Sequence, residues 1–310
     1  MIELKKSISQ KLRMEGRDYS RPGWYFVTLG SDYHQYMFGR IRNGEMHPNA
    51  LGQLVERCWQ EIPQHYPHIH LGAWQVMPTH FHGIVQIRRN TGKGLGEVVN
   101  MFKGSVTRLW RKSGAQLPVI SRHGGKGPPK VWAPNYYDVI CFDEQELEVR
   151  EAYVRANPRR WALKQVPAGE LRPGVRYRGN KGILRAAGPR KALRVSRRAT
   201  ETEIAALRQQ LESFDGIVCS TFFSPGERAC LQAVQTGSAR IVWVLPTAMP
   251  EHIPVSWTDA FVQQRAIWIS TFPDDMTEAT RETCQRANAK VQAFCQRPQS
   301  TPAINQGFQP

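Results

Sequence analysis

The sequence lacks the patterns that mark several large protein classes. Its six cysteines are far apart and include no CxxC pair, which argues against a zinc ribbon and a disulfide framework. No apolar run approaches the ~20 residues that a bilayer-spanning helix needs. The first residues are basic but are not followed by the apolar segment of a signal peptide. We therefore expect a cytoplasmic protein with reduced thiols and no membrane partner.

The sequence also has no GxGxxG and no GxxxxGK[ST] motif, so the usual fingerprints of dinucleotide and ATP binding are missing. Acidic residues are scarce relative to basic ones: 26 aspartates and glutamates face 42 lysines and arginines, a net charge of +16. Such an excess favours a polyanionic partner, above all nucleic acid. The 310 residues, 41% of them hydrophobic, are enough for packed cores. At ~100–200 residues per domain, this length predicts two domains.

Residues 23–161 alternate between strand-like and helix-like segments. Aromatic and β-branched patterns typical of strands occur at 24–29, 36–41, 69–76, 81–87 and 139–141. Apolar spacing typical of helices occurs at 50–66, 98–110 and 143–157, the last starting at Asp143 and closed by Pro158. This order predicts an α+β fold of the ferredoxin-like type, with an antiparallel sheet, over residues 1–162.

The rest of the chain changes character twice. Residues 163–191 are rich in arginine, lysine, proline and glycine, which predicts an exposed basic linker, either merely solvated or in contact with phosphates. Over residues 192–297, short apolar strands, the first expected at 193–195, alternate with helices. This pattern predicts a parallel, Rossmann-like α/β sheet. Residues 298–310 are rich in glutamine and proline, and we expect a disordered tail.

The most informative stretch is VMPTHFHGIV at residues 76–85. Alternate residues of a strand share a face, so His80 and His82 point the same way, with backbones about 6–7 Å apart. Two imidazoles at this spacing can chelate one metal ion. A single histidine in a strand is more often structural, so the signal lies in the pair.

A second pair lies on the helix expected to end at Pro158. Tyr153 and Asn157 are four residues apart and therefore share a helix face. An amide oxygen can complete a metal site, and a phenol beside it can reach a metal-bound phosphate. Taken alone, the pair is better explained by a core tyrosine and a helix-ending asparagine before proline.

Together these segments resemble the REP-associated tyrosine transposases, a branch of the single-tyrosine HUH transposases. The likeness rests on VMPTHFH at 76–82, NYYD at 135–138 and YVRANP at 153–158. The aromatic strand near residue 24 and the basic helix near residue 105 occur in the order that this family shows. The likeness covers residues 23–161, about half of the chain; typical members end soon after the Asn-Pro helix.

The resemblance implies a role for each residue of the two pairs. His80 and His82 would bind Mg²⁺ or Mn²⁺, and Asn157 would supply the third ligand. Tyr153 would attack a phosphodiester, giving a 5′-phosphotyrosine and a 3′-hydroxyl, and the reverse attack would rejoin strands. The family recognises hairpins in extragenic palindromic repeats, which implies single-stranded or hairpin DNA as the partner. A nucleoid location and a monomer or homodimer would follow.

Basic and aromatic residues near these motifs predict a phosphate track with base stacking. The expected DNA-binding residues are Lys103, Arg108, Trp110, Arg111, Lys112, Arg159 and Arg160. A solvated helix face is the alternative for the basic helix. Tyr136 and Tyr137 are rival nucleophiles by residue type, although packing or base stacking also explains them.

Residues 192–297 weakly resemble the Rossmann-like fold of the DNA-processing A and lysine-decarboxylase-like (LOG) families. The likeness rests on STFFSPGER at 220–228, VWVLP at 242–246 and RAN at 286–288. Ser224 followed by Pro225 predicts a helix start, whose backbone N–H groups could hold a phosphate at Ser224 and Gly226. Plain helix capping is the alternative. We expect an accessory DNA-binding or regulatory domain.

The resemblance thus implies a transposase, a DNA strand transferase with a tyrosine nucleophile. Two other classes stay open. One is a catalytically inactive hairpin-DNA-binding or regulatory protein, against which the presence of all four expected site residues argues. The other is an HUH nuclease of the replication-initiator or relaxase type, but such enzymes often use two tyrosines or a different motif order.

Overall fold

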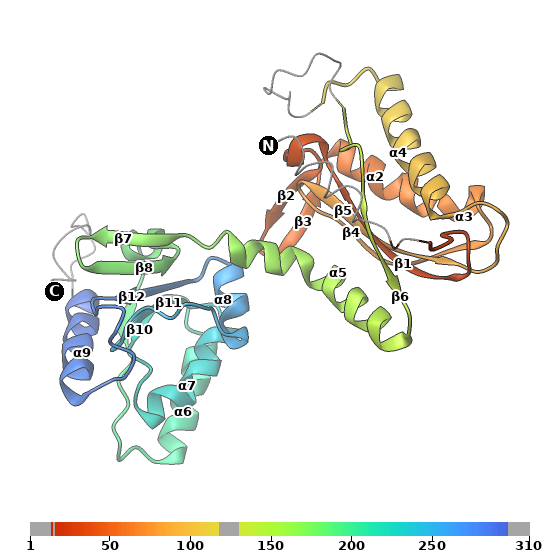
Figure 1. Cartoon of the computed structure of the whole chain (residues 1–310). Helices are drawn as coiled ribbons and strands as arrows, with labels where there is room; N and C mark the ends of the chain where they lie inside the picture. Colours follow the sequence, from red (N-terminus) through yellow and green to blue (C-terminus); the bar gives the residue numbers. More distant parts are fainter. Residues whose placement is uncertain (1–13, 15, 118–129, 297–310) are drawn as a thin grey trace. The chain divides into compact units, whose positions relative to one another are not determined.

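A computed structural model describes residues 14, 16–117 and 130–296 of the chain (Figure 1). The chain divides into two compact units, Met1–Arg160 and Trp161–Pro310. Both units mix helices and strands, and each is described by itself. The expected disordered tail, 298–310, lies outside the described residues.

The first unit is built on a four-stranded antiparallel sheet in the order β4-β5-β1-β6. Its strands are β1 (Gly23–Gly30), β4 (Ile69–Val76), β5 (His80–Ile87) and β6 (Tyr137–Cys141). All four lie where aromatic and β-branched patterns predict strands. The expected strand at 36–41 is displaced: β2 (Gly39–Arg42) and β3 (Glu45–Pro48) form a separate two-stranded hairpin.

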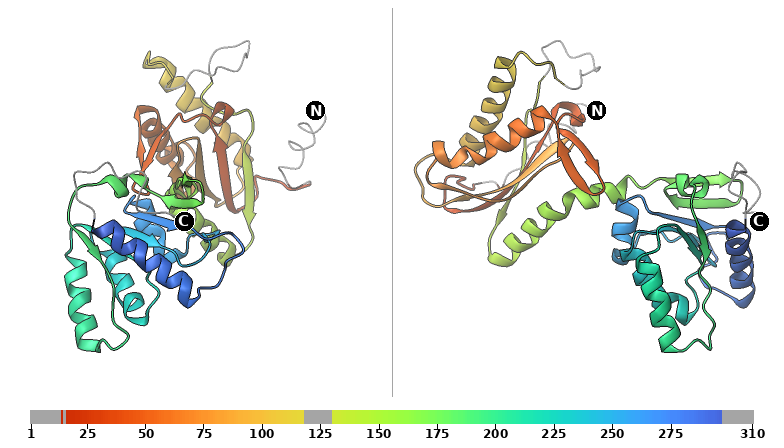
Figure 2. Two further views of the ribbon diagram at one scale, coloured as in Figure 1. Left: turned by 90° about the vertical axis from the view of Figure 1, so that its left-hand side faces the viewer. Right: turned by 180° about the vertical axis from the view of Figure 1, so that it is seen from behind.

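Helices cover both faces of this sheet (Figures 1 and 2). They are α2 (Ala50–Gln60), α3 (Ile62–His65), α4 (Leu95–Lys112) and α5 (Glu144–Lys164), with a short 3-10 turn η1 (Asp32–His34). The larger core lies under α2 and α4, where the ring of Trp59 contacts Phe81 and Phe102 at centroid distances of 4.7 and 5.1 Å. The opposite face carries a smaller core that includes Phe26 and Val154, under α5.

The helix α5 is longer than expected. Asp143 accepts a hydrogen bond from the backbone N–H of Glu146 (2.7 Å), which caps the helix start as predicted. The helix does not end at Asn157; it continues through Pro158 to Lys164. A proline inside a helix removes one backbone hydrogen bond. Here both Asn157 and Pro158 are buried, so tertiary packing overrides the local stop signal.

The second unit contains a six-stranded mixed sheet in the order β7-β8-β12-β11-β10-β9. Its strands are β7 (Ala168–Arg172), β8 (Val175–Gly179), β9 (Arg190–Ala192), β10 (Ile217–Ser220), β11 (Arg240–Val244) and β12 (Ala266–Ser270). The strands β9 to β12 are parallel, as the alternating pattern predicts, whereas β8 joins β12 antiparallel. The first parallel strand precedes the segment 193–195 where it was expected.

Helices also cover both faces of the second sheet (Figure 1). One core includes residues of α6 (Glu201–Glu212), α7 (Pro225–Thr236), η3 (Val255–Trp257) and α8 (Thr258–Val262). The other core includes residues of η2 (Lys181–Arg185) and α9 (Arg281–Cys295). Alternate residues of β12 supply the two cores, with Trp268 in the first and Ile267 and Ile269 in the second.

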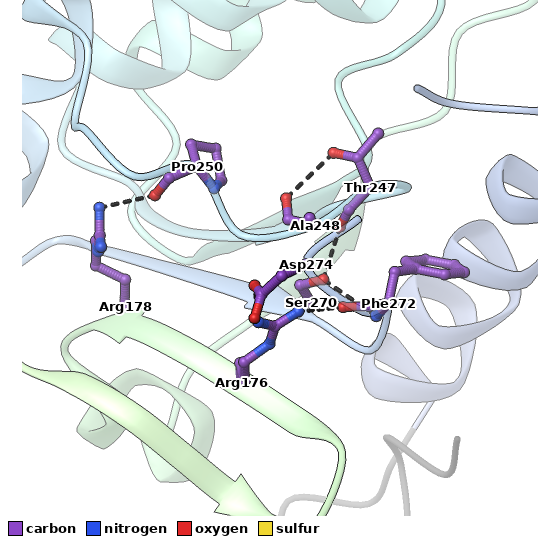
Figure 3. Close-up of polar contacts among 8 residues, drawn as sticks. All are labelled: Arg176, Arg178, Thr247, Ala248, Pro250, Ser270, Phe272 and Asp274. Carbon is purple, nitrogen blue, oxygen red and sulfur yellow. Dashed lines mark hydrogen bonds and ion pairs between the residues drawn. The ribbon is translucent and has the colours of Figure 1, made fainter. Parts of the chain in front are cut away.

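The expected basic linker at 163–191 is instead part of the second fold. It contains β7, β8, η2 and the start of β9. Val175 is buried in the core under α9, while Arg176 and Arg178, on the alternate positions of β8, donate hydrogen bonds to backbone carbonyls of other loops (Figure 3). The strand is hard to recognise from the sequence because these arginines alternate with the core-facing residues and bond to loop carbonyls. In the part of the chain that the structure describes, no helix combines the length and apolar character needed to cross a bilayer.

Candidate active site

The two histidines of the HxH motif lie on β5 and face the same side of the first sheet. Phe81 and Val85, on the alternate positions, belong to the core under α2 and α4. Ile84, which shares the parity of the histidines, belongs to the smaller core under α5. Strand parity therefore places His80 and His82 on one face, as the sequence predicts, and the structure shows that this face lies under α5.

The imidazoles of His80 and His82 face one another. Their Nε2 atoms are 3.0 Å apart, and the ring planes meet at 75°. Each Nδ1 atom has a hydroxyl partner: Thr28 Oγ1 lies 2.9 Å from Nδ1 of His82, and Thr79 Oγ1 lies 3.0 Å from Nδ1 of His80. When the Nδ1 atoms carry the protons, both Nε2 lone pairs point into one small volume.

The protonation of His82 follows from its surroundings. Its side chain is only 4% exposed. Burial, and then the charge of His80, lowers the pKa of His82 to about 3. His82 is therefore neutral at neutral pH, and the neutral imidazole is the form that binds metal ions.

Tyr153 reaches this pair from α5. Its ring centroid is 5.5 Å from that of His82, with an interplanar angle of 73°. Phe26 of β1 stacks on His82 at 5.4 Å and meets Tyr153 edge-on at 6.1 Å. The guanidinium of Arg160 lies 5.4 Å from the Tyr153 ring centroid. The structure thus brings together His82 and Tyr153, which are far apart in the sequence.

Asn157 lies one helical turn after Tyr153 and is 6% exposed. Among the described residues, no group of three or more histidine, cysteine, aspartate or glutamate side chains could hold a metal ion. Asn157 is the candidate that the sequence names for a third ligand beside His80 and His82.

The rival tyrosines occupy different surroundings. Tyr136 packs against the core under α2 and α4. Tyr137 is 47% exposed on β6 and lies opposite Thr28, which in turn lies opposite His82. Residues paired across neighbouring strands share a face, so Tyr137 stands in the same row as His82. This relationship makes Tyr137 the stronger rival of Tyr153.

The predicted DNA-binding residues lie on two helices, α4 and α5. Several of them line a pocket of about 520 Å³ on α4, the helix on the sheet face opposite to the histidine pair. The residues that line this α4 pocket are Lys103, Gly104, Thr107, Arg108, Arg111, Lys130, Val131 and Trp132. Lys112 is exposed at the end of the same helix. Arg159 and Arg160 are exposed on α5.

Two of these residues have structural roles that were not expected. Lys103 donates hydrogen bonds from Nζ to the carbonyl oxygens of Ala133 (2.7 Å) and Pro134 (3.2 Å), and burial lowers its pKa. Trp110 packs partly buried against the first core. Lys103 therefore fixes the 133–134 segment to α4.

Ser224 and Gly226, the residues expected to hold a phosphate, have structural roles: Ser224 caps a helix, and Gly226 allows close packing. Ser224 Oγ accepts a hydrogen bond from the backbone N–H of Glu227 (3.2 Å). The Glu227 carboxylate in turn accepts from the N–H groups of Phe223 and Ser224. A Cβ on Gly226 would meet Val195 Cγ1 at 2.3 Å. Gly226 allows close packing against Val195, and the buried Glu227 carboxylate would repel a bound anion.

Thr28 and Thr79 are the site residues that the motifs did not reveal. Thr79 is directly adjacent to His80, but nothing in its spacing distinguishes it from a turn residue. Thr28 lies in the aromatic strand β1, 54 residues before His82. The pairing of β1 with β5 is the signal that identifies it.

Comparison with known proteins finds limited similarity in sequence and in structure. No protein-family profile matches the chain. An uncharacterised protein of Haemophilus influenzae is 29% identical over 178 residues, which cover 51% of this chain and 92% of that protein. The structure of a REP-associated tyrosine transposase bound to a REP hairpin covers 48% of this chain and 74% of its own, at 15% identity and a TM-score of 0.34. A protein of Deinococcus radiodurans assigned as a transposase covers 46% of this chain and 98% of its own, at 14% identity and a TM-score of 0.30.

Proposed function

We propose that the first unit is a metal-dependent DNA strand transferase of the single-tyrosine HUH type, a transposase that cuts and rejoins single-stranded DNA. The observation that carries the proposal is the convergence of His80, His82 and Tyr153. The two Nε2 atoms are 3.0 Å apart, and the Tyr153 ring lies 5.5 Å from that of His82. In this proposal the four-stranded sheet and its helices are the ferredoxin-like core of that family.

Tyr153 is the proposed nucleophile. Its hydroxyl oxygen gives up its proton to solvent and attacks the phosphorus, the bond from phosphorus to the 3′-oxygen breaks, and that oxygen leaves and takes up a proton from solvent. The phosphate remains on the tyrosine as a 5′-phosphotyrosine, which conserves the bond energy for rejoining. The guanidinium of Arg160 lies over the Tyr153 ring, 5.4 Å from its centroid, and supplies positive charge beside the phenol.

The residues present fit a divalent metal ion. Two imidazoles directed at one point would hold it, and Asn157 would supply an oxygen ligand. When bound, the ion would neutralise charge on the scissile phosphate. The two nitrogen donors favour Mn²⁺ over Mg²⁺, because Mg²⁺ prefers a shell made of oxygens. Thr28 and Thr79 would keep the rings of His82 and His80 in the binding orientation.

The α4 pocket extends the proposed DNA contact beyond the cut site. Arg108, Arg111 and Lys130 line it and present guanidinium and ammonium groups to phosphates. The pocket and the histidine pair lie on opposite faces of the same sheet, so a DNA that fills both must pass around the sheet edge. A hairpin with a single-stranded flank, the substrate that the sequence resemblance implies, provides both parts. The second unit would be an accessory DNA-binding or regulatory domain.

The direct test is a cleavage assay. The full chain is incubated with Mn²⁺ and a 3′-end-labelled single strand that contains a hairpin, and the products are separated on a denaturing gel. The proposal predicts a covalent protein–DNA band that needs the metal ion and disappears in His82→Ala. A wild-type protein that binds the hairpin but gives no covalent band favours the inactive DNA-binding alternative.

A further inference from the structure

A third histidine, His34, lies on the same face of the first sheet as the HxH pair. Gly30, the last residue of β1, is paired directly with His80 of β5. Strand alternation places position 30 on the face of Thr28, which is also the face of His80 and His82. A Cβ built on Gly30 would meet Cε1 of His34 at 3.1 Å and Nδ1 at 3.3 Å. The His34 ring therefore occupies the place of a side chain at position 30, across from His80.

The η1 loop, residues 31–36, carries His34 and is anchored at two points. The N–H of Ser31 donates to the carbonyl of Thr79 (2.8 Å), the residue that directly precedes β5. The N–H of Asp32 donates to the carbonyl of Val131 (3.0 Å), which lines the α4 pocket. The η1 loop thus connects the two surfaces that the proposed function assigns to DNA.

The backbone of the η1 loop has an unfavourable conformation where the histidine lies. Tyr33 and His34 have φ of 52° and 53°, in the left-handed region that residues other than glycine rarely adopt. Such residues persist only where the surrounding contacts determine them, and they are concentrated at sites that bind or react. Here this conformation holds an exposed imidazole on the face of the histidine pair.

The position of His34 suits a contact with substrate and not a further metal ligand. Among the described residues, no three histidine, cysteine, aspartate or glutamate side chains form a group that could hold a metal ion. An imidazole carries an N–H donor in either tautomer, and phosphate oxygens are the commonest acceptors in protein–DNA contacts. We infer that His34 is a substrate-contact residue, whose ring N–H donates a hydrogen bond to a backbone phosphate of the single strand beside the cut site.

This inference rests on the proposed function and deepens it, because it states where the single strand runs. The strand leaves the α4 pocket, passes the η1 loop and reaches the histidine pair. The two anchors of the loop, at Thr79 and at Val131, lie at the two ends of that path.

The first test measures binding in a full chain that carries Tyr153→Phe, so that the proposed nucleophile is absent. The probe is a labelled DNA hairpin with a single-stranded flank, in the presence of Mn²⁺, and fluorescence anisotropy gives the affinity. Adding His34→Ala should weaken binding about tenfold, because a hydrogen bond to a charged phosphate is lost. His65→Ala removes an exposed histidine at the end of α3; it is the matched control and should leave the affinity unchanged.

A series of modified strands locates the contact. Each phosphate of the single-stranded flank is replaced in turn by an uncharged methylphosphonate. With His34 present, one replacement should weaken binding about as much as His34→Ala does. With His34→Ala, the same replacement should cause no further loss, because the two partners of one contact are not additive. A purely structural role of His34 would give the same profile of losses in both proteins.

Gly30 offers a second variant that acts on the same ring. Valine at position 30 would fill the space of the His34 imidazole, so Gly30→Val should displace the ring and weaken binding about as much as His34→Ala. In the double variant the space is already empty, and the affinity should equal that of His34→Ala alone. A loss that adds to that of His34→Ala would contradict the inferred contact.

Two further results overturn the inference: His34→Ala that binds the hairpin like the His65→Ala control, or methylphosphonate profiles that coincide in the two proteins. Covalent product is measured separately, in chains that retain Tyr153. If wild type gives no covalent product but the His34 effects on binding are present, the proposed cleavage fails and the contact stands. If covalent product forms and the binding effects are absent, cleavage stands and the contact fails.

Discussion

Thr28 and His82 lie directly opposite each other in neighbouring strands, and the threonine hydroxyl is 2.9 Å from Nδ1 of the imidazole. This contact links the aromatic strand β1 to the HxH motif on β5. It occupies the Nδ1 side of the ring and turns Nε2 toward His80. Hydrogen-bond partners of this kind set the orientation and tautomer of metal-binding histidines.

Thr28→Val should therefore weaken Mn²⁺ binding about 10- to 100-fold while the fold is retained, since valine keeps the shape and removes the hydroxyl. Isothermal titration of the full chain with Mn²⁺ measures the affinity. Thr107→Val, on α4 and away from the histidines, is the control and should bind Mn²⁺ as wild type does. An unchanged affinity in Thr28→Val would show that the hydroxyl does not position His82.

The glycine between His82 and Ile84 should be intolerant of a side chain. A Cβ on Gly83 would meet Trp59 Cζ2 at 2.3 Å, in the densest part of the first core. Gly83→Ala should lower the free energy of unfolding by about 1–3 kcal/mol. Gly104→Ala, where nothing lies within 4 Å, should instead raise it by about 0.5–1 kcal/mol. Chemical denaturation of both variants checks the opposite signs.

The α4 pocket should contribute to DNA affinity without contributing to chemistry. Arg108→Ala and Arg111→Ala should each weaken hairpin binding and reduce the slope of log affinity against log salt by about 1. The yield of covalent product at saturating DNA should stay near wild type, because the pocket lies on the other face of the sheet. Filter binding at several salt concentrations measures the slope, and Lys181→Ala in the second unit is the control. Unchanged slopes in both pocket variants would contradict the proposed contact between the α4 pocket and DNA phosphates.

Lys290 should make stability depend on pH in the alkaline range. Its pKa is lowered from 10.5 to about 8, so between these values the unfolded chain binds more protons than the native one. The free energy of unfolding therefore rises with pH across that window relative to a variant without the group. The free energy of unfolding of wild type minus that of Lys290→Met should therefore increase from pH 8 to pH 10.5. Parallel pH profiles of the two proteins would contradict this.

Strand and helix periodicity was enough to predict several parts of the site. The parity of β5 places His80 and His82 on one face, and the spacing of four places Tyr153 and Asn157 on one helix face. What periodicity does not contain is the pairing of distant strands. Only the register of β1 against β5 and β6 brings Thr28 to His82 and sets Tyr137 in the same row.

The larger error concerns the arginine-rich segment at 163–191. Arginine, proline and glycine are typical of an exposed linker, but Arg176 and Arg178 bond to loop carbonyls while Val175 fills the core. The same reason explains α5, which passes Pro158 because Asn157 and Pro158 are themselves buried. In both places the secondary structure depends on tertiary contacts, which a local sequence pattern does not contain.

The central claim is that Tyr153 carries the phosphate. The covalent protein–DNA product is digested with protease and nuclease, and mass spectrometry identifies the tyrosine that retains the nucleotide. We predict a single modified residue, Tyr153, and no adduct in Tyr153→Phe, with normal adducts in Tyr136→Phe and Tyr137→Phe. A nucleotide found on Tyr137, or an undiminished adduct in Tyr153→Phe, would contradict the account.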